Sequence, residues 1–268
     1  MAALVTRGGV STPLRVLLLL GLALAACAAP SPRRLTETHP YEQAAPGEGW
    51  MVTVSSCRLP DSMPWYSRFA HHAWIDVRNA EGFWTRVEIL GFPFSVRVDG
   101  IAEANAFAAR RFGRDVHLIK VLAGPQAEPI VARVLELAEA CEDYGQLVVE
   151  WDEQGGYSGK VIPPEGRDYR NWPGPNSNTF VAWIIEATPG LHAELHHNAV
   201  GKDYPEGFRV GPTSAGYGIE AELAWLGVGL GLSQGLELHI LGMTAGLDFW
   251  PPAIKLPLLP RIGFAASN

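Results

Sequence analysis

The stretch 217–250 constrains the fold more than any other part of the chain, because glycine and leucine alternate with polar residues along it. Glu237 and His239 stand two residues apart, as do two glutamates near its start. This spacing is typical of β-strands, whose successive side chains point to opposite faces, and the charges interrupt any membrane-spanning helix. We therefore expect two long strands joined near residues 233–235. A surface for the lipid headgroup region is the alternative for this stretch.

The preceding part of the chain mixes strand-like segments, rich in β-branched and aromatic residues, with segments whose apolar residues recur at helical spacing. A turn that ends in capping residues introduces the last of the helices. The fold class that follows is α+β, with an antiparallel sheet packed on helices, and the second and third strands are close enough to form a hairpin. We expect strands over 50–57, 70–78, 82–90 and 115–124, and helices over 101–111, 128–142 and from Asn176 or Ser177 to Pro189.

The N-terminus has the pattern of a lipoprotein signal peptide over residues 1–27. Arginines precede the apolar run 16–26, which is too short to span a membrane. The run ends in Leu-Ala-Ala before Cys27, which resembles the lipobox of bacterial lipoproteins and predicts lipid attachment at Cys27. An ordinary signal peptide cut near Ala29 is the alternative.

The expected domain organisation follows from this N-terminus. Residues 28–47 form a flexible linker rich in alanine and proline, 48–204 an α+β domain, and 205–268 a β-rich extension packed on the same domain. An acyl chain on Cys27 would tether the domain to the periplasmic side of the inner or outer membrane. The membrane is thus an expected partner, and the oligomeric state is left open.

Charge and cysteine content narrow the function classes. The net charge of -7 and the lack of basic runs argue against nucleic-acid binding. Two of the three cysteines, Cys57 and Cys141, remain after Cys27 is set aside, and their pairing is left open. Cys141 falls in a helical segment, where a small buried cysteine is the ordinary interpretation.

The segment 172–183, WPGPNSNTFVAW, places Ser177 at the start of a predicted helix. A helix start offers free N–H groups and a partial positive charge, which stabilise an anion there. A serine hydroxyl still needs a neighbouring base to act as a nucleophile. Without such a base, Asn176 and Ser177 are ordinary capping residues.

Strand alternation makes His72 the candidate base. His71 shares the apolar face of its strand, whereas His72 lies on the mixed face. Asp76 lies too far along the same strand to orient His72, so the orienting residue is expected on the neighbouring strand, where Glu88 or Arg86 shares a face with Trp84. Glu88 is the candidate third member of the site, and His117, on another strand, is the alternative. A strand histidine hydrogen-bonded near the core is the structural alternative.

The block Asn176-Ser177-Asn178-Thr179-Phe180 resembles the N-C-N-x-F motif of circularly permuted papain-like families, the PPPDE-type peptidases and the lecithin retinol acyltransferase-like proteins. In those families a strand histidine precedes the nucleophile, as His72 precedes Ser177. The resemblance implies a papain-like fold in permuted order, with hydrolysis of an amide or ester or acyl transfer. Serine replaces the family's cysteine, so the site has either been rebuilt as a Ser–His pair or retired from catalysis.

The same block, together with HHAWI and NAVGKDY, resembles an uncharacterised bacterial lipoprotein family, domain of unknown function family 3750, over most of residues 65–260. We therefore expect an envelope lipoprotein with a Ser/His hydrolase or acyltransferase site. The alternative is a catalytically inactive papain-like binding or scaffold lipoprotein. Peptidoglycan, a peptide or a lipid is the expected substrate, and the residues expected to bind it are Asn176, Asn178, Trp172, Trp74 and Lys202.

No metal and no cofactor are expected. His192 and His196 have the i, i+4 spacing that lets one helix face bind zinc, but the glutamate of the H-E-x-x-H motif does not follow His192 directly. A metal-dependent hydrolase at this pair is a third alternative. We expect these histidines to lie at the surface or near the cleft.

Overall fold

The structure, a computed structural model, describes residues 49–65, 67–90, 95–139, 141, 146–151, 157–162, 169–204, 208–223 and 225–264. The predicted signal peptide, the lipid site at Cys27 and the linker lie outside these residues. No helix among the described residues has the length and apolar character needed to cross a bilayer.

The first sheet has six strands in the order β4-β3-β2-β1-β6-β5, and every neighbouring pair is antiparallel. Its β2–β3 hairpin confirms the predicted one, because Val77 pairs with Thr85 and Asp76 with Arg86. The strands are β1 (Met51–Arg58), β2 (His71–Arg78), β3 (Trp84–Leu90), β4 (Ser95–Ile101), β5 (Arg110–Arg111) and β6 (Arg114–Ala123).

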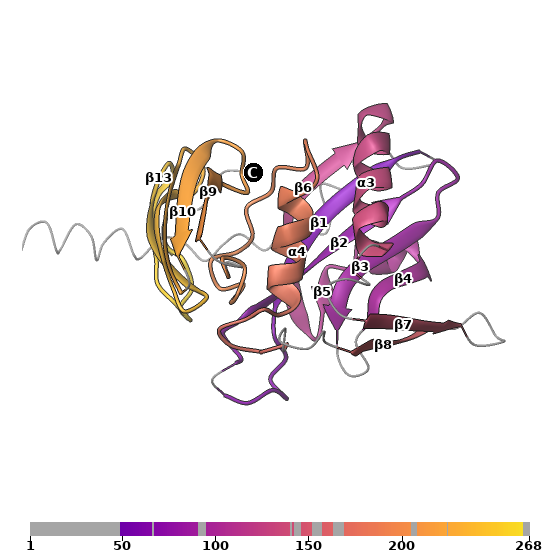
Figure 1. The fold of residues 1–268 in the computed structure, drawn as a ribbon, viewed down its shortest axis with the longest axis horizontal. Coiled ribbons are helices and arrows are strands. Elements are labelled where there is room, and N and C mark those ends of the chain that lie inside the picture. Colours follow the sequence, from indigo (N-terminus) through magenta and orange to yellow (C-terminus); the bar gives the residue numbers. More distant parts are fainter. Residues whose placement is uncertain are drawn as a thin grey trace, which may run out of the picture.

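Helices α3 (Glu128–Glu139) and α4 (Ser177–Glu186) pack on one face of this sheet, as Figure 1 shows. The main hydrophobic core lies between the sheet and these two helices. Alternate residues of β2, such as Ala73 and Ile75, pack there with Phe180 and Ile184 of α4. All four side chains are fully buried. The 3.6-residue period of the helices and the two-residue period of the strand thus meet in one apolar layer.

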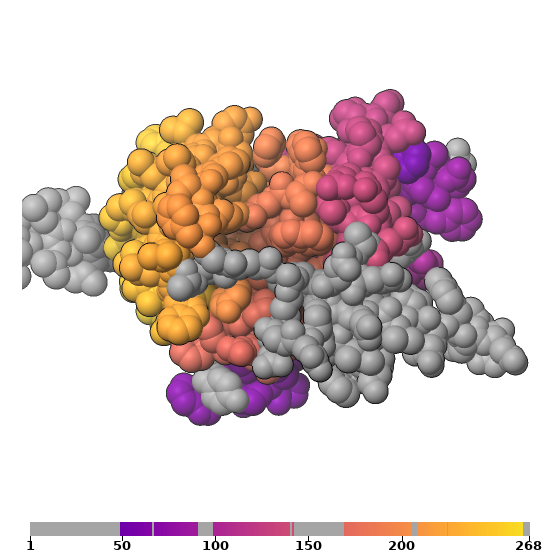
Figure 2. Space-filling model, viewed as in Figure 1, coloured from indigo at the N-terminus to yellow at the C-terminus, as the bar shows by residue number. Residues whose placement is uncertain are grey.

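The second sheet is a seven-stranded antiparallel meander in the order β15-β14-β13-β12-β11-β10-β9, which bows away from the first sheet (Figure 1). In the space-filling view its orange to yellow residues form one end of the molecule (Figure 2). Its strands are β9 (Phe208–Pro212), β10 (Gly218–Leu223), β11 (Leu226–Gly231), β12 (Gly235–Ile240), β13 (Met243–Phe249), β14 (Pro252–Lys255) and β15 (Ile262–Gly263).

Short elements complete the described chain. The hairpin of β7 (Gln146–Trp151) and β8 (Tyr157–Ile162) forms a separate two-stranded sheet. Helix α2 (Glu103–Ala106) and the 3-10 turn η2 (Pro125–Ala127) flank β5 and β6.

Two predictions about the elements are wrong. The helix expected over 101–111 is a single turn, α2, followed by strand β5, because Ala102 supplies no capping side chain and the chain turns back through Phe112 and Gly113, both at positive φ. The stretch 217–250 forms four strands rather than two, although β11 and β12 do meet near residues 233–235 as expected. The coarse prediction of an antiparallel sheet packed on helices is confirmed.

Candidate functional site

Helix α4 begins with a complete capping box. The Asn176 side chain accepts hydrogen bonds from the backbone N–H groups of Asn178, at 2.9 Å, and Thr179, at 3.3 Å, while the Thr179 hydroxyl accepts from Asn176 N at 3.1 Å. Gly201 packs directly on this cap, since a Cβ at that position would lie 2.4 Å from Asn176 Nδ2. The predicted cap is confirmed.

Ser177 is the first residue of α4 and is 9% exposed. The next two N–H groups of the helix start are taken by the Asn176 side chain. Among the described residues, the N–H of Ser177 has no hydrogen-bond partner. The positive end of the helix therefore leaves one backbone donor, that of Ser177 itself, for an anion.

Asn178 docks the helix start against β2. Its Oδ1 accepts from Ala73 N at 3.0 Å, and its Nδ2 donates to His71 O at 2.8 Å and to Val200 O at 3.0 Å. The pairing of β2 with β3 begins only at Ile75, which leaves these main-chain groups of β2 to the asparagine. Because they flank His72 on both sides, the helix start lies at the strand edge beside His72.

His72 and Glu88 form a buried pair across the hairpin. His72 Nε2 lies 2.7 Å from Glu88 Oε2, and both side chains are less than a tenth exposed. Arg111 donates to both carboxylate oxygens, at 2.5 and 2.8 Å. Burial alone would raise the pKa of Glu88, but the hydrogen bond from His72 and the charge of Arg111 lower it to about 2.

This pair lies on the face of the sheet opposite the helices. Ala73 and Ile75 point to α4, so the alternate residues His72 and Trp74 point the other way, where Trp74 Nε1 donates to Asp76. The His72 ring centroid lies 6.2 Å from that of Trp74 and 6.1 Å from that of Phe112. Among the described residues, no hydrogen bond joins the Ser177 hydroxyl to His72.

The other predicted binding residues are dispersed. Trp172 is 53% exposed, whereas Trp74 is buried beneath Arg111, whose guanidinium lies 4.5 Å from its ring centroid. Lys202, a predicted substrate-binding residue, is buried. Its Nζ lies 2.7 Å from Asp203 and 3.5 Å from Glu237. The ammonium of Lys202 is therefore neutralised within the protein.

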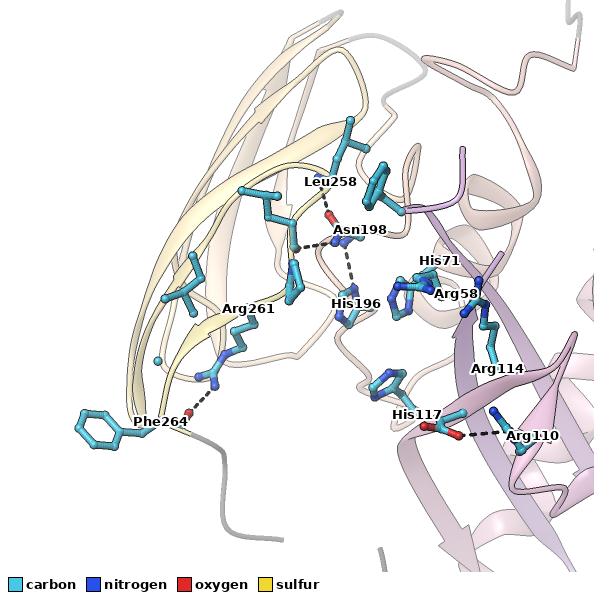
Figure 3. A pocket seen from close by; sticks show the side chains of 16 residues that line it. Arg58, His71, Arg110, Arg114, His117, His196, Asn198, Leu258, Arg261 and Phe264 are labelled. Atoms are coloured by element: carbon cyan, nitrogen blue, oxygen red, sulfur yellow. Dashed lines mark hydrogen bonds and ion pairs between the residues drawn. The ribbon is translucent and has the colours of Figure 1, made fainter. Parts of the chain in front are cut away.

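A second group of polar residues lines a cleft of about 790 Å³ between the two sheets (Figure 3). His71 of β2, His117 of β6 and His196 meet there: the rings of His71 and His196 stack with centroids 3.7 Å apart, and that of His117 lies 5.3 Å from that of His71. Sequence reasoning missed this cluster, although the position of His71 on the helix-facing side of β2 was a signal for it. Four arginines and one aspartate also line the cleft, Arg58, Arg110, Arg114, Arg261 and Asp115.

The histidines of the cleft are held neutral. Burial, with the neighbouring His117, His197 and Arg58, lowers the pKa of His71 to about 3. Burial and the adjacent imidazoles lower the pKa of His196 further, and burial lowers that of His117. His196 Nδ1 accepts from Asn198 N at 3.1 Å, whereas the buried His71 Nδ1 has no hydrogen-bond partner among the described residues. The cleft thus offers neutral imidazoles beside arginines, of which Arg110, Arg114 and Arg261 are paired with aspartates.

The metal alternative has no structural support within the described residues. The segment around His192 and His196 is irregular rather than helical, so the two side chains do not share a helix face. In the described part of the chain, no three of the histidine, cysteine, aspartate and glutamate side chains are arranged to hold a metal ion. Cys57 and Cys141 are both buried and free, so they do not form a disulfide.

Comparison with known protein families gives a match over a short segment of the chain. Residues 162–204 match the family described as "Protein of unknown function (DUF3750)". No curated protein and no solved structure matches the chain. The match is shorter than the resemblance expected over 65–260, but it includes the capping box, Ser177 and the loop that carries His196. The chain is similar to this uncharacterised family over the segment that builds the helix start.

Proposed function

We propose that this chain is a lipid-anchored protein of the bacterial cell envelope with an acyl-transfer site. Ser177 is the nucleophile, His72 the general base and Glu88 the residue that orients His72. The 2.7 Å hydrogen bond between His72 and Glu88 is the observation that carries the proposal. It supplies a base with an ionised orienting partner, at the strand position beside the start of α4.

The proposed mechanism follows from the two nitrogens of His72. With Nε2–H donated to the Glu88 carboxylate, Nδ1 carries the lone pair. Because the His72 ring points to the face opposite α4, the proposed mechanism requires a water at the strand edge that carries the proton of the Ser177 hydroxyl to Nδ1 as Ser177 Oγ bonds to the carbonyl carbon of an amide or ester. The carbonyl oxygen gains the electron pair and is stabilised by the N–H of Ser177. Nδ1 then returns the proton to the leaving group, and water or an acceptor alcohol or amine releases the acyl group.

The chain order supports the same proposal. A strand histidine followed by a helix-start nucleophile is the order of permuted papain-like proteins, and we propose that the first sheet with α3 and α4 corresponds to that fold. The substrate is an amide or ester of the envelope, in a peptidoglycan peptide, a protein or a lipid. Asn176 and Asn178 position Ser177 by fixing the helix start on the loop at Val200 and on β2.

A second candidate function is binding without catalysis. It is favoured by the burial of Ser177, His72 and Glu88, each less than a tenth exposed, and by the cleft being lined by other residues. In this case Ser177 is a helix cap alone, and the ligand enters the cleft at His71 and His196. An anionic ligand would match Arg58 of the cleft, whereas Arg110, Arg114 and Arg261 are paired with aspartates.

Labelling with a fluorophosphonate probe tests the catalytic proposal. The full-length protein in membranes should be labelled, and Ser177→Ala should abolish labelling. Ser214→Ala is the matched control and should keep it. In Ser177→Cys, the introduced thiol should react with iodoacetamide near neutral pH in a manner that depends on His72. No labelling of wild type, together with an inert thiol in Ser177→Cys, would reject catalysis and leave the binding candidate.

The anchor is tested separately by metabolic labelling with a radioactive fatty acid. The wild-type chain should incorporate the label and partition into the detergent phase. Cys27→Ser should do neither, while the free residues Cys57 and Cys141 provide an internal control for non-specific acylation. Incorporation that persists in Cys27→Ser would exclude Cys27 as the lipid site.

A further inference from the structure

We propose that the outward face of the C-terminal sheet, here called the outer face, lies against the acyl-chain boundary of a lipid bilayer. The outer face consists of the outward-pointing side chains of β10 to β13. At its centre are Val228, Leu230, Leu236, Leu238, Ile240 and Leu247, which are between 42% and 51% exposed.

Strand alternation produces this face without exception on the two central strands. Exposed and buried positions alternate along β11 and β12, and all exposed positions are apolar. Across the two strands Val228 pairs with Leu238 and Leu230 with Leu236. Such cross-strand pairs place apolar side chains in contact with one another, so the face is continuous rather than a scatter of single residues.

The opposite face of the same sheet holds the charges. Glu237, His239 and Glu222 are at most 2% exposed. They bond to one another, since His239 Nε2 lies 3.2 Å from Glu237 and Nδ1 bonds to Glu222. Lys255 Nζ lies 2.6 Å from Glu237. A sheet with one solvated face normally presents polar residues to water, and here that polarity is inverted.

A face of this kind requires an apolar environment, because large apolar patches on soluble monomers are rare and mark interaction surfaces. Aromatic side chains flank it: Trp225 in the β10–β11 turn is 60% exposed, and Trp250 in the β13–β14 turn is 83% exposed. The antiparallel meander puts these turns at opposite ends of the strands. Tryptophan at such margins is typical of surfaces at the membrane–water interface.

A bilayer fits the outer face better than a second copy of the chain does. The sheet bows outward, so the outer face is convex (Figure 1). Two convex faces touch over a small area, whereas a stable dimer buries roughly 800 Å² on each partner. A fluid lipid surface adapts to the curvature.

The anchor proposed above brings the bilayer within reach, and the choice of occupant rests on it. The 21 residues between Cys27 and Gly49 span at most about 80 Å when extended. A tether of this length permits the domain to contact the membrane but does not by itself keep it there. Contact of the outer face with lipid would stabilise the membrane-bound position of the domain.

Fluorescence quenching tests the proposal on the full-length protein reconstituted into vesicles of phosphatidylethanolamine and phosphatidylglycerol that contain brominated lipid. Trp225 and Trp250 should be quenched, and the quenching should be largely lost in the Trp225→Phe, Trp250→Phe double variant. Leu238→Glu should reduce the population in contact about tenfold, because a charge replaces an apolar side chain at the centre of the face. Phe83→Glu, at a 69% exposed site in the turn between β2 and β3, is the matched control and should leave quenching unchanged.

Equal quenching in wild type and Leu238→Glu would overturn the proposal. So would a lipid-free dimer in sedimentation equilibrium that Leu238→Glu converts to monomer, because the face would then bind a second copy. Circular dichroism should show that Leu238→Glu remains folded, as expected for an exposed position. If Cys27 carries no lipid but the outer face does contact the bilayer, the results differ. The tryptophans of Cys27→Ser would still be quenched, and the Leu238→Glu protein would be released from the vesicles.

Discussion

The buried histidines of the cleft predict a specific dependence of stability on pH. His71 is 6% exposed, and burial with its charged neighbours lowers its pKa from 6.5 to about 3 in the folded protein. A group whose folded pKa is lowered in this way stabilises the fold fully only above its unfolded pKa. That stability is lost as the pH falls from 6.5 toward 3, because the unfolded chain then binds a proton that the folded chain does not.

The magnitude follows from the unfolded pKa alone. At pH 8 neither state binds the proton, whereas at pH 5 the unfolded state is stabilised by about 2 kcal/mol through protonation of this one histidine. In His71→Asn the asparagine cannot titrate. The free energy of unfolding of wild type should therefore fall relative to that of His71→Asn by about 2 kcal/mol between pH 8 and pH 5. His196→Asn should behave in the same way, since burial and its neighbours lower its pKa too.

Urea titrations of wild type and variant at both pH values, followed by tryptophan fluorescence, measure this difference. The wild type is compared with the variant at each pH because other groups also change the stability with pH. His239, whose pKa is raised to about 9, adds stability as the pH falls through that value. His192→Asn, at an exposed position, is the matched control for replacing a histidine by asparagine. The measured quantity is the free energy of unfolding of wild type minus that of His71→Asn. If this quantity is the same at pH 5 as at pH 8, or larger at pH 5, the reasoning is refuted.

Three further predictions concern other parts of the fold. Asn178→Ala should lower the free energy of unfolding by about 2–4 kcal/mol, measured in urea, because main-chain groups of β2 lose their partner; a loss below about 1 kcal/mol would mean that water replaces the side chain. Lys255→Met should cost about 3–5 kcal/mol because the buried carboxylates of Glu237 and Asp248 lose the ammonium that they share, whereas Arg133→Met, in an exposed ion pair, should cost less than about 1 kcal/mol; equal losses would contradict this ranking. Cys57 and Cys141 should resist iodoacetamide at pH 8 until urea is added, because burial raises their pKa to about 11 and about 12; rapid alkylation of the native protein would contradict their burial.

Local rules predicted the part of the site that depends on neighbouring residues. Strand alternation separated His71 from His72, and the hairpin brought Glu88 rather than Asp76 to His72, since Asp76 pairs with Arg86 at 2.6 Å. The cap at Asn176 likewise follows from the few residues around it. In each case the partners lie on one strand, one hairpin or one helix turn, where sequence spacing fixes geometry.

The cleft was beyond such rules. His71, His117 and His196 come from β2, β6 and a loop after α4, and each segment carries only a single member with no recognisable spacing.

The number of C-terminal strands was missed for a different reason. Two-residue loops such as Leu241-Gly242 place a positive-φ leucine and a glycine between strands, and the leucine continues the apolar pattern instead of interrupting it.

The charges of the C-terminal stretch have a different meaning in the structure from the one they have in the sequence. In the sequence, Glu237 and His239 indicate strand periodicity and argue against a membrane-spanning helix. In the structure both side chains point inward, where Lys255 and Glu222 neutralise them, and the alternate positions present leucine to the outside. The ion network therefore removes every charge from the outer face of β12 while satisfying the interior of the fold. Breaking that network from within, as in Lys255→Met, should weaken the sheet without making the outer face more polar, whereas Leu238→Glu does the reverse. The two variants thus separate the stability of the sheet from its affinity for lipid.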